Sequence, residues 1–128
     1  MKTIKQFNKG FSLFELMITC AIIGIMSAFS FSIYTQHVIH ADRAMAKSLL
    51  MQLSVAMEKY YFEHGSYQGV SLDVLQVEHN LEHYSFSVNV VSDNDYVLLA
   101  RSERDVVCGE MSVNAVGERF GGSEECWK

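Results

Sequence analysis

The segment His79-Asn80-Leu81-Glu82-His83 combines residue types that bind and activate zinc in one class of metalloproteases. On a helix, His79 and His83 would share a face and could ligate zinc, with Glu82 as the general base. The surrounding pattern disfavours this site, because the motif ends one residue before a strand pattern and leaves little helix to hold the ligands. A small zinc hydrolase is therefore an alternative hypothesis only.

Other polar residues also lack the context that chemistry requires. His37 and His40 could bind a metal but are better explained as solvated residues near a membrane surface. Asp93 and Asp95 resemble part of a calcium loop, yet the remaining ligands and the glycine are missing, so a turn explains them better. The chain has no phosphate-binding glycine loop and no nucleophile motif. We expect no catalytic residue, no metal and no cofactor.

An apolar run dominates the N-terminal third of the 128-residue chain. Leu16 to Ile33 are eighteen residues without a charged side chain, enough for a transmembrane helix and more than the usual apolar part of a signal peptide. A buried core helix is the rival explanation, but a domain this small rarely encloses a helix that is apolar on every side. The run therefore predicts a membrane helix or the core of a helix bundle.

The charges predict how the chain is oriented. Three lysines, Lys2, Lys5 and Lys9, precede the apolar run with no acidic residue among them. Basic residues beside a membrane helix tend to stay in the cytoplasm, so everything after about residue 40 should lie outside. Without residues 1–10, the chain has 7 basic and 15 acidic residues, a net charge of −8. This acidic balance disfavours nonspecific binding to a nucleic-acid backbone, without excluding a small local site.

The cysteines agree with an oxidising compartment. Cys108 and Cys126 lie in the head, and a bridge between them would stabilise it by roughly 3 kcal/mol. Two unpaired thiols are the alternative. Cys20 lies inside the apolar run, where it opens a stripe of small residues spaced four apart: Cys20, Gly24, Ala28 and Ser32. Small residues let helices approach closely in a membrane, so this stripe predicts helix packing.

One long helix should position these groups. The sequence contains no proline, and the first strong helix stop is Gly65, so a helix could run from Phe11 to about Glu63, on the order of 80 Å. After residue 40 the helix becomes amphipathic, with charged residues such as Asp42 and Arg43 between the apolar ones. The predicted packing face consists of Ala41, Met45, Leu49, Leu53, Ala56, Met57 and Tyr60.

Strand patterns follow the helix. A loop with a possible helical turn spans Gly69 to Glu82, and alternation then predicts strands at Tyr84–Val90, Tyr96–Arg101 and Val107–Val113. Turns are expected at Ser92–Asp95 and Asn114–Gly117. The fold class is therefore α+β, a long helix covered by a small antiparallel sheet with a C-terminal region stapled by the disulfide.

The segment Lys9-Gly10-Phe11-Ser12-Leu13-Phe14-Glu15-Leu16 resembles the leader and start of a type IV prepilin. The resemblance implies that prepilin peptidase cuts between Gly10 and Phe11, and that Phe11 is then N-methylated. It also explains Glu15, a carboxylate at the head of an apolar run. The new Phe11 amine of a neighbouring subunit could pair with Glu15, which would favour assembly in register.

Two further segments resemble type IVa pilins. Met57–Tyr61 followed by Gly65–Tyr67 is similar to the end of their long helix, and Cys108–Val113 with Cys126-Trp127 is similar to their disulfide-bounded region. Many major pilins carry proline at the position of Ser32, where this chain keeps a backbone donor. The resemblance therefore implies a minor pilin. A type II secretion pseudopilin is the alternative within the superfamily, and a membrane-anchored binding protein is the alternative outside it.

The resemblance also implies an organisation and a location. We expect a cleaved cytoplasmic leader (1–10), a membrane and filament-core helix (11–39) and a periplasmic or extracellular head (40–128). The expected partners are other pilin subunits, prepilin peptidase and the pilus assembly machinery of the inner membrane, with nucleic acid only if the pilus takes up DNA. The chain should be a single-pass inner-membrane protein before assembly and part of a cell-surface pilus afterwards.

Overall fold

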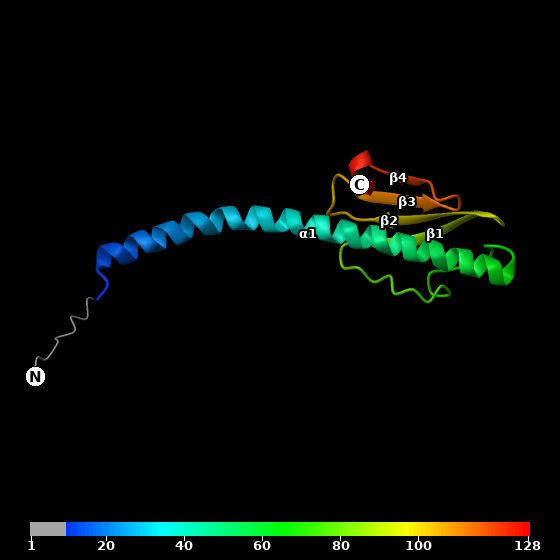
Figure 1. Cartoon of the computed structure of the whole chain (residues 1–128), viewed down its shortest axis with the longest axis horizontal. Helices are drawn as coiled ribbons and strands as arrows, with labels where there is room; N and C mark the ends of the chain where they lie inside the picture. Colours follow the sequence, from blue (N-terminus) through cyan, green and yellow to red (C-terminus); the bar gives the residue numbers. More distant parts are fainter. Residues whose placement is uncertain (1–9) are drawn as a thin grey trace, which may run out of the picture. The chain divides into compact units, whose positions relative to one another are not determined.

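The computed structural model describes residues 10–128. Its elements are one long helix, a four-stranded sheet and a short 3-10 helix (Figure 1). In chain order they are α1 (Leu13–His64), β1 (Ser85–Ser92), β2 (Asp95–Arg101), β3 (Glu110–Asn114), β4 (Arg119–Gly121) and η1 (Glu124–Trp127). The predicted α+β class is confirmed. Lys2, Lys5 and Lys9 lie outside the described residues, so the orientation they indicate stays a prediction.

Both ends of α1 have local causes. At its start, the Ser12 hydroxyl accepts a hydrogen bond from the N–H of Glu15 at 3.2 Å, as an N-cap serine does. At its end, Gly65 adopts φ +74°, the left-handed conformation that glycine tolerates, and its N–H bonds the Tyr61 carbonyl at 2.7 Å. The predicted bounds, Phe11 and about Glu63, are therefore close to the observed ones.

The chain divides into two compact units, Met1–Gln36 and His37–Lys128, and α1 contributes residues to both. In the first unit, the apolar part of α1 is long enough to cross a membrane, and none of it is buried. Its hydroxyl groups bond back to the helix: Thr19 donates to the Glu15 carbonyl at 3.0 Å and Ser27 to the Ile23 carbonyl at 2.7 Å. These hydroxyl groups therefore need little water.

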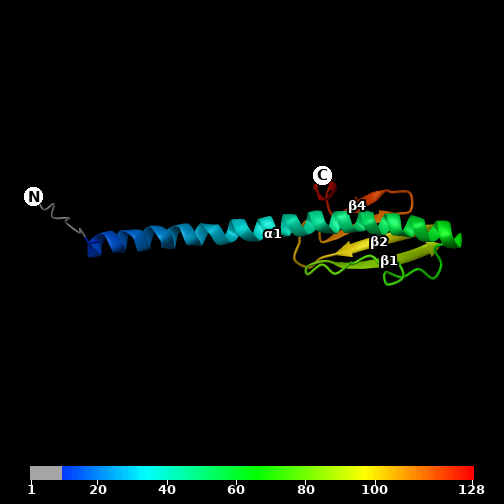
Figure 2. The same ribbon diagram turned by 60° about the horizontal axis from the view of Figure 1, so that its bottom comes forward.

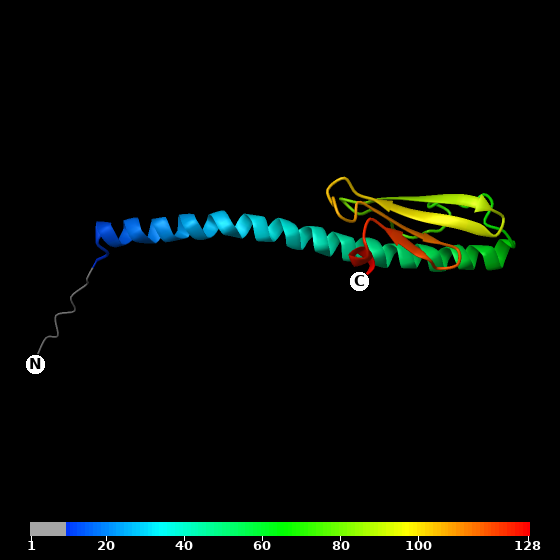
Figure 3. The ribbon, with the colours of Figure 1, turned by 90° about the horizontal axis from the view of Figure 1, so that it is seen from above.

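The second unit, the head unit, packs the sheet against the later half of α1. The strands follow the order β1-β2-β3-β4 and every pair is antiparallel (Figure 1). Figure 2 shows β1 and β2 running in opposite directions. Figure 3 shows the sheet lying along one side of the helix. Buried side chains alternate along β2, and Leu98 pairs with Val88 on one neighbour and Val113 on the other. The predicted strands are present, but β3 begins at Glu110 rather than Val107, and β4 and η1 were not predicted.

The buried face of α1 differs from the predicted one. Ala46, Leu50, Leu53 and Met57 are fully buried, whereas Met45 is 49% exposed and Ala41 is exposed. The apolar residues of this segment form two adjoining rows on the helix surface, and a periodicity of four residues fits either row. The sheet covers only one of them, so the prediction was wrong for Ala41 and Met45 and right for Leu53 and Met57.

Candidate functional site

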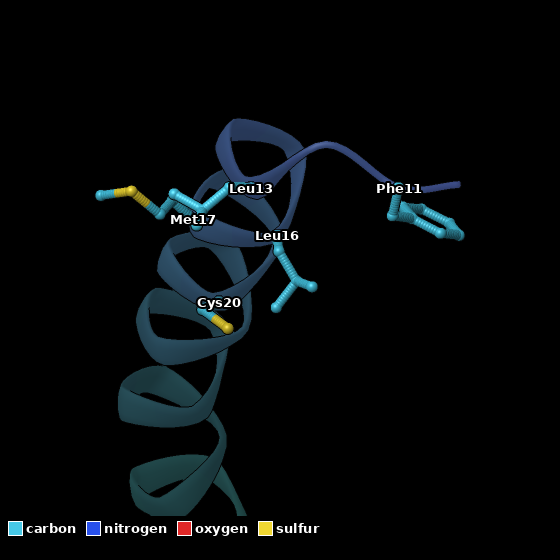
Figure 4. A pocket seen from close by; sticks show the side chains of 5 residues that line it. All are labelled: Phe11, Leu13, Leu16, Met17 and Cys20. Carbon is cyan, nitrogen blue, oxygen red and sulfur yellow. The ribbon is translucent and has the colours of Figure 1, made fainter. Parts of the chain in front are cut away.

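The start of α1 and the residues just before it carry the groups expected to act in assembly. Phe11, two residues before α1, is 79% exposed, and Glu15, in the first turn of α1, is also exposed. The apolar helix surface that follows is not covered by the rest of the described chain. An open apolar hollow lies here, lined by Phe11, Leu13, Leu16, Met17 and Cys20. Figure 4 shows these side chains spread around the start of the helix, with Met17 and Phe11 on opposite sides. Apolar side chains arranged in this way are suited to contact lipid or another helix.

The small residues expected to pack helices are also uncovered. Cys20 is a free, exposed cysteine, and a Cβ added to Gly24 would meet nothing within 4 Å. Ala28 and Ser32 are exposed on the same helix. Because the four residues are spaced four apart, they lie along one side of α1. Their role in helix packing stays a prediction.

The zinc-binding motif does not form the helix that its spacing requires. Residues 79–83 contain an irregular stretch and a turn, and Leu81 bridges Tyr84. His79 Nδ1 lies 2.9 Å from the Val77 carbonyl, whereas the His83 ring faces Asp42 and Arg104. The two imidazoles are therefore engaged separately. Within residues 10–128, no group of three or more His, Cys, Asp or Glu side chains is placed to hold a metal.

The C-terminal region is closed by the expected disulfide. Cys108 and Cys126 are joined, with their Cα atoms 5.5 Å apart, and both are fully buried. The bridge connects the loop before β3 to η1. Gly122 packs so closely that an added Cβ would lie 2.4 Å from the Val107 carbonyl oxygen. The loop before β3 and the segment from Gly122 to η1 therefore form one tightly packed region.

A buried ion pair fastens this region to α1. Arg43 donates from Nε and Nη2 to the two carboxylate oxygens of Asp105 at 2.8 and 2.9 Å. Tyr84 donates its hydroxyl to the same carboxylate at 2.9 Å, and the N–H groups of Val107 and Cys108 donate at 3.1 and 2.9 Å. The side chain of Asp105 is only 3% exposed, so these five hydrogen bonds replace the water that it loses.

The ionisation of this cluster follows from its contacts. Burial alone would raise the pKa of Asp105, but hydrogen bonds from Arg43, the Cys108 N–H and Tyr84 outweigh burial and lower it to about 2. Burial and the adjacent Asp105 carboxylate raise the pKa of Tyr84. Asp105 is therefore an anion and Tyr84 a neutral donor at neutral pH.

His83 makes a second set of polar contacts, with Arg104 and with Asp42, the residue before Arg43. Arg104 donates to His83 Nε2 at 2.7 Å, which leaves the other ring nitrogen, Nδ1, to carry the proton. That Nδ1 lies 2.8 Å from Asp42 Oδ2, a close contact whose angle is poor for a hydrogen bond. The sequence analysis placed Asp42 and Arg43 between the apolar residues of the amphipathic helix and predicted neither contact. Their partners lie far along the chain, and no local spacing indicates them.

The surface around β4 and η1 combines aromatic and basic side chains. The Arg119 guanidinium lies 5.7 Å from the centre of the Trp127 ring, and the Trp127 Nε1–H donates to the Phe120 carbonyl at 3.0 Å. Phe120 is 53% exposed. Lys47 reaches the same corner from α1 and donates to the Lys128 carbonyl at 2.8 Å.

Comparison with known proteins decides the family. A family described as "Type IV minor pilin ComP, DNA uptake sequence receptor" matches residues 32–112, and the prokaryotic N-terminal methylation motif matches residues 5–31. This chain belongs to the type IV pilin family. The pilin is 39% identical over 62 residues to the fimbrial protein EcpC of Eikenella corrodens (48% of this chain, 40% of that protein). It is 33% identical over 94 residues to the type IV major fimbrial protein FimA of Dichelobacter nodosus (73% of this chain, 58% of that protein).

Solved structures show the same fold. A type IV pilin from Shewanella oneidensis superposes with a TM-score of 0.55 at 26% identity, covering 67% of this pilin and 93% of that chain. The non-core minor pilin PilV of Neisseria meningitidis superposes with a TM-score of 0.52 at 19% identity, covering 68% of this pilin and 94% of that chain. The matches to EcpC and FimA span about half the length of those curated relatives.

Proposed function

We propose that this type IV pilin is a structural subunit of a type IV pilus, and a minor rather than a major one. The observation that carries the proposal is the uncovered apolar part of α1, joined through one continuous helix to a folded head unit. The match to a minor-pilin family over residues 32–112 supports the minor role. Ser32, which stands where many major pilins have proline, supports it as well. The paired Cys108 and Cys126 favour a pilin over a secretion pseudopilin.

Processing follows from the start of the chain. We infer cleavage between Gly10 and Phe11 by prepilin peptidase and N-methylation of Phe11, supported by the methylation-motif match over residues 5–31. The leader itself, residues 1–10, has only Gly10 within the described part. Before assembly, residues 11–39 would anchor the pilin in the inner membrane with the head, residues 40–128, in the periplasm. The assembly machinery and neighbouring pilins would then take it into the surface filament.

Mass spectrometry of the mature protein tests this processing. The N-terminal peptide from membranes and from sheared pili is expected to begin with N-methyl-Phe11. A Gly10→Val variant, which removes the residue before the cut, should instead accumulate as the full-length chain in the membrane. Intact Met1 in the wild-type membrane protein would contradict the proposal and favour a membrane-anchored binding protein.

Assembly would depend on the Phe11 amine and Glu15. Cleavage creates a cation at Phe11, near the depth in the membrane at which Glu15 places a carboxylate. Each charge alone is unfavourable in the apolar layer, where the cost of a charged side chain rises to about 2.5–3.5 kcal/mol at the bilayer centre. When a neighbouring subunit brings its Phe11 amine to Glu15, the two charges compensate each other, so association in register is favoured. The small-residue stripe from Cys20 to Ser32 would let the paired helices approach closely.

A second candidate function is DNA binding by the assembled pilin. The matching family is described as a DNA uptake sequence receptor, and that description is the observation that favours it. The head unit is acidic overall, so a DNA site would have to be local. The corner formed by Arg119, Trp127 and Lys47 fits best, because within residues 10–128 Arg119 forms no ion pair with a carboxylate. An exposed cation beside aromatic rings can contact phosphate and stack on a base.

Substitution of Arg119 tests the DNA site. An Arg119→Ala variant of the full chain is expected to bind duplex DNA more weakly in a gel-shift assay, with the salt slope of the binding constant reduced by about 1. Arg101→Ala is the matched control, because Arg101 is already paired with Glu110 at 2.8 Å. Equal effects of the two variants, or no binding by the wild type, would argue against DNA recognition at this corner.

A further inference from the structure

Two adjacent valines project from the head unit at the loop that precedes β3. Val106 is 95% exposed and Val107 is 53% exposed, although both follow the buried Asp105 and precede the buried Cys108. We call Val106 and Val107 the valine tip. Single exposed apolar residues are common on protein surfaces, so the tip matters only if the fold holds it outward.

The surrounding backbone does hold the valine tip outward. The Asp105 carboxylate accepts the N–H groups of Val107 and Cys108, and the disulfide fixes Cys108 to η1. A Cβ on Gly109 would lie 2.6 Å from the Asp105 carbonyl oxygen, and one on Gly122 would lie 2.4 Å from the Val107 carbonyl oxygen. These contacts fix the backbone on both sides of the valine tip, with the Val106 side chain almost fully exposed and the Val107 side chain about half exposed.

The valine tip lies at the end of the head unit where the apolar part of the chain enters it. Asp105 is bound to Arg43, six residues after His37, which is about 9 Å along the helix from the first residue of the head unit. In all three ribbon views the loop that carries the tip lies at the opposite end of the sheet from the β1–β2 turn (Figures 1, 2 and 3).

We propose that the valine tip inserts into the surface of the phospholipid bilayer while the pilin is stored in the membrane before assembly. The proposal rests on the membrane anchoring argued above. Anchoring would hold this end of the head unit close to the lipid headgroups, where two outward valines can enter the acyl boundary. The tip would then act as a second, weak contact that restrains the head on the membrane.

Lipid fits the tip better than another protein does. A stable protein–protein interface buries about 800 Å² on each partner, and two valine side chains provide only a small part of that area. A bilayer requires no complementary shape. The charged neighbours Glu103 and Arg104 have opposite signs and are both exposed, so their charges largely cancel. The contact should therefore be apolar in character and persist at high salt.

Fluorescence of a labelled tip in vesicles tests the inference. The full-length pilin, with Cys20→Ser to remove the free thiol, is reconstituted into vesicles of phosphatidylethanolamine and phosphatidylglycerol. An environment-sensitive fluorophore is attached at Val106→Cys or, as the matched control, at Val116→Cys. Val116 is 78% exposed and follows β3 on the same head unit. The probe at position 106 is expected to emit at shorter wavelength than the probe at position 116. Lipids that carry a nitroxide near the headgroup should quench the probe at position 106 more strongly than the probe at position 116, and this difference should persist at high salt.

Two separate results would contradict the inference and its premise. Failure of the reconstituted protein to float with the vesicles would contradict membrane anchoring itself. Normal flotation with a probe at position 106 that is as exposed to water as the probe at 116 would overturn the valine-tip contact alone. Shielding of position 106 in filaments but not in vesicles would assign the tip to a neighbouring subunit and would also overturn the lipid contact.

Discussion

Replacing Asp105 with alanine is expected to lower the free energy of unfolding of the head unit by about 3–5 kcal/mol, the usual cost of removing one partner of a buried ion pair. Arg43, whose side chain is 11% exposed, would be left with an uncompensated charge. Tyr84 and the N–H groups of Val107 and Cys108 would lose an acceptor as well. Urea unfolding of the purified pilin, with its disulfide intact, measures the change.

The matched control is the exposed ion pair between Arg101 and Glu110. Their side chains are 63% and 60% exposed, so Glu110→Ala should cost about 0–1 kcal/mol. If Asp105→Ala cost no more than Glu110→Ala, the buried pair would not be what fastens the disulfide region to α1. An Arg43→Met and Asp105→Leu double variant should recover part of the stability, because it leaves no unpaired charge.

The lowered pKa of Asp105 predicts how the free energy of unfolding depends on pH. The pKa of Asp105 is lowered to about 2 in the folded pilin, against an ordinary value near 3.9 in the unfolded chain. The folded state therefore binds this proton less readily than the unfolded state does. The resulting stabilisation is fully present above about pH 4 and is lost as the pH falls from about 4 to about 2. Urea titrations across this range should show a steeper loss for the wild type than for Asp105→Asn, and parallel curves would contradict the assignment.

Replacing Glu15 with valine is expected to abolish or strongly reduce incorporation into pili while leaving leader cleavage largely intact. The Phe11 amine of the neighbouring subunit would then be buried without its partner, at about 3–5 kcal/mol for each contact. That corresponds to a reduction of roughly a hundred- to several-thousand-fold in the association constant. Immunoblots of membrane and sheared-pilus fractions measure both the processing and the incorporation.

Two comparisons make the Glu15 experiment decisive. Glu15→Ala should behave like Glu15→Val, because both remove the charge. Ser27→Ala is the control on the same helix, since the Ser27 hydroxyl bonds its own backbone at the Ile23 carbonyl and should not matter to a neighbour. Normal amounts of Glu15→Val and Glu15→Ala in sheared pili would refute the charge-pair mechanism.

The sequence by itself determined the features that depend on near neighbours in the chain. The uncharged run from Leu16 to Ile33 indicated the apolar helix, and Gly65 marked the helix end, because composition and backbone freedom act locally. Alternation predicted the strands, and the segment from Lys9 to Leu16 indicated the family. The pairing of Cys108 with Cys126 also followed, since these are the two cysteines outside the apolar run.

Only the tertiary structure decided which surfaces meet. The sheet buries the row of α1 that contains Ala46 and Leu50 and leaves Met45 exposed, because a sheet can cover only one side of a helix. The tertiary structure also brought Arg43, which the sequence pattern placed only between apolar helix residues, into a buried ion pair with Asp105, 62 residues away. Periodicity reports neighbours within about four residues, whereas a buried charge is stable only where a distant partner is brought to within hydrogen-bonding distance. The fold of the head unit brings Asp105 to Arg43, and the same contact holds the valine tip outward.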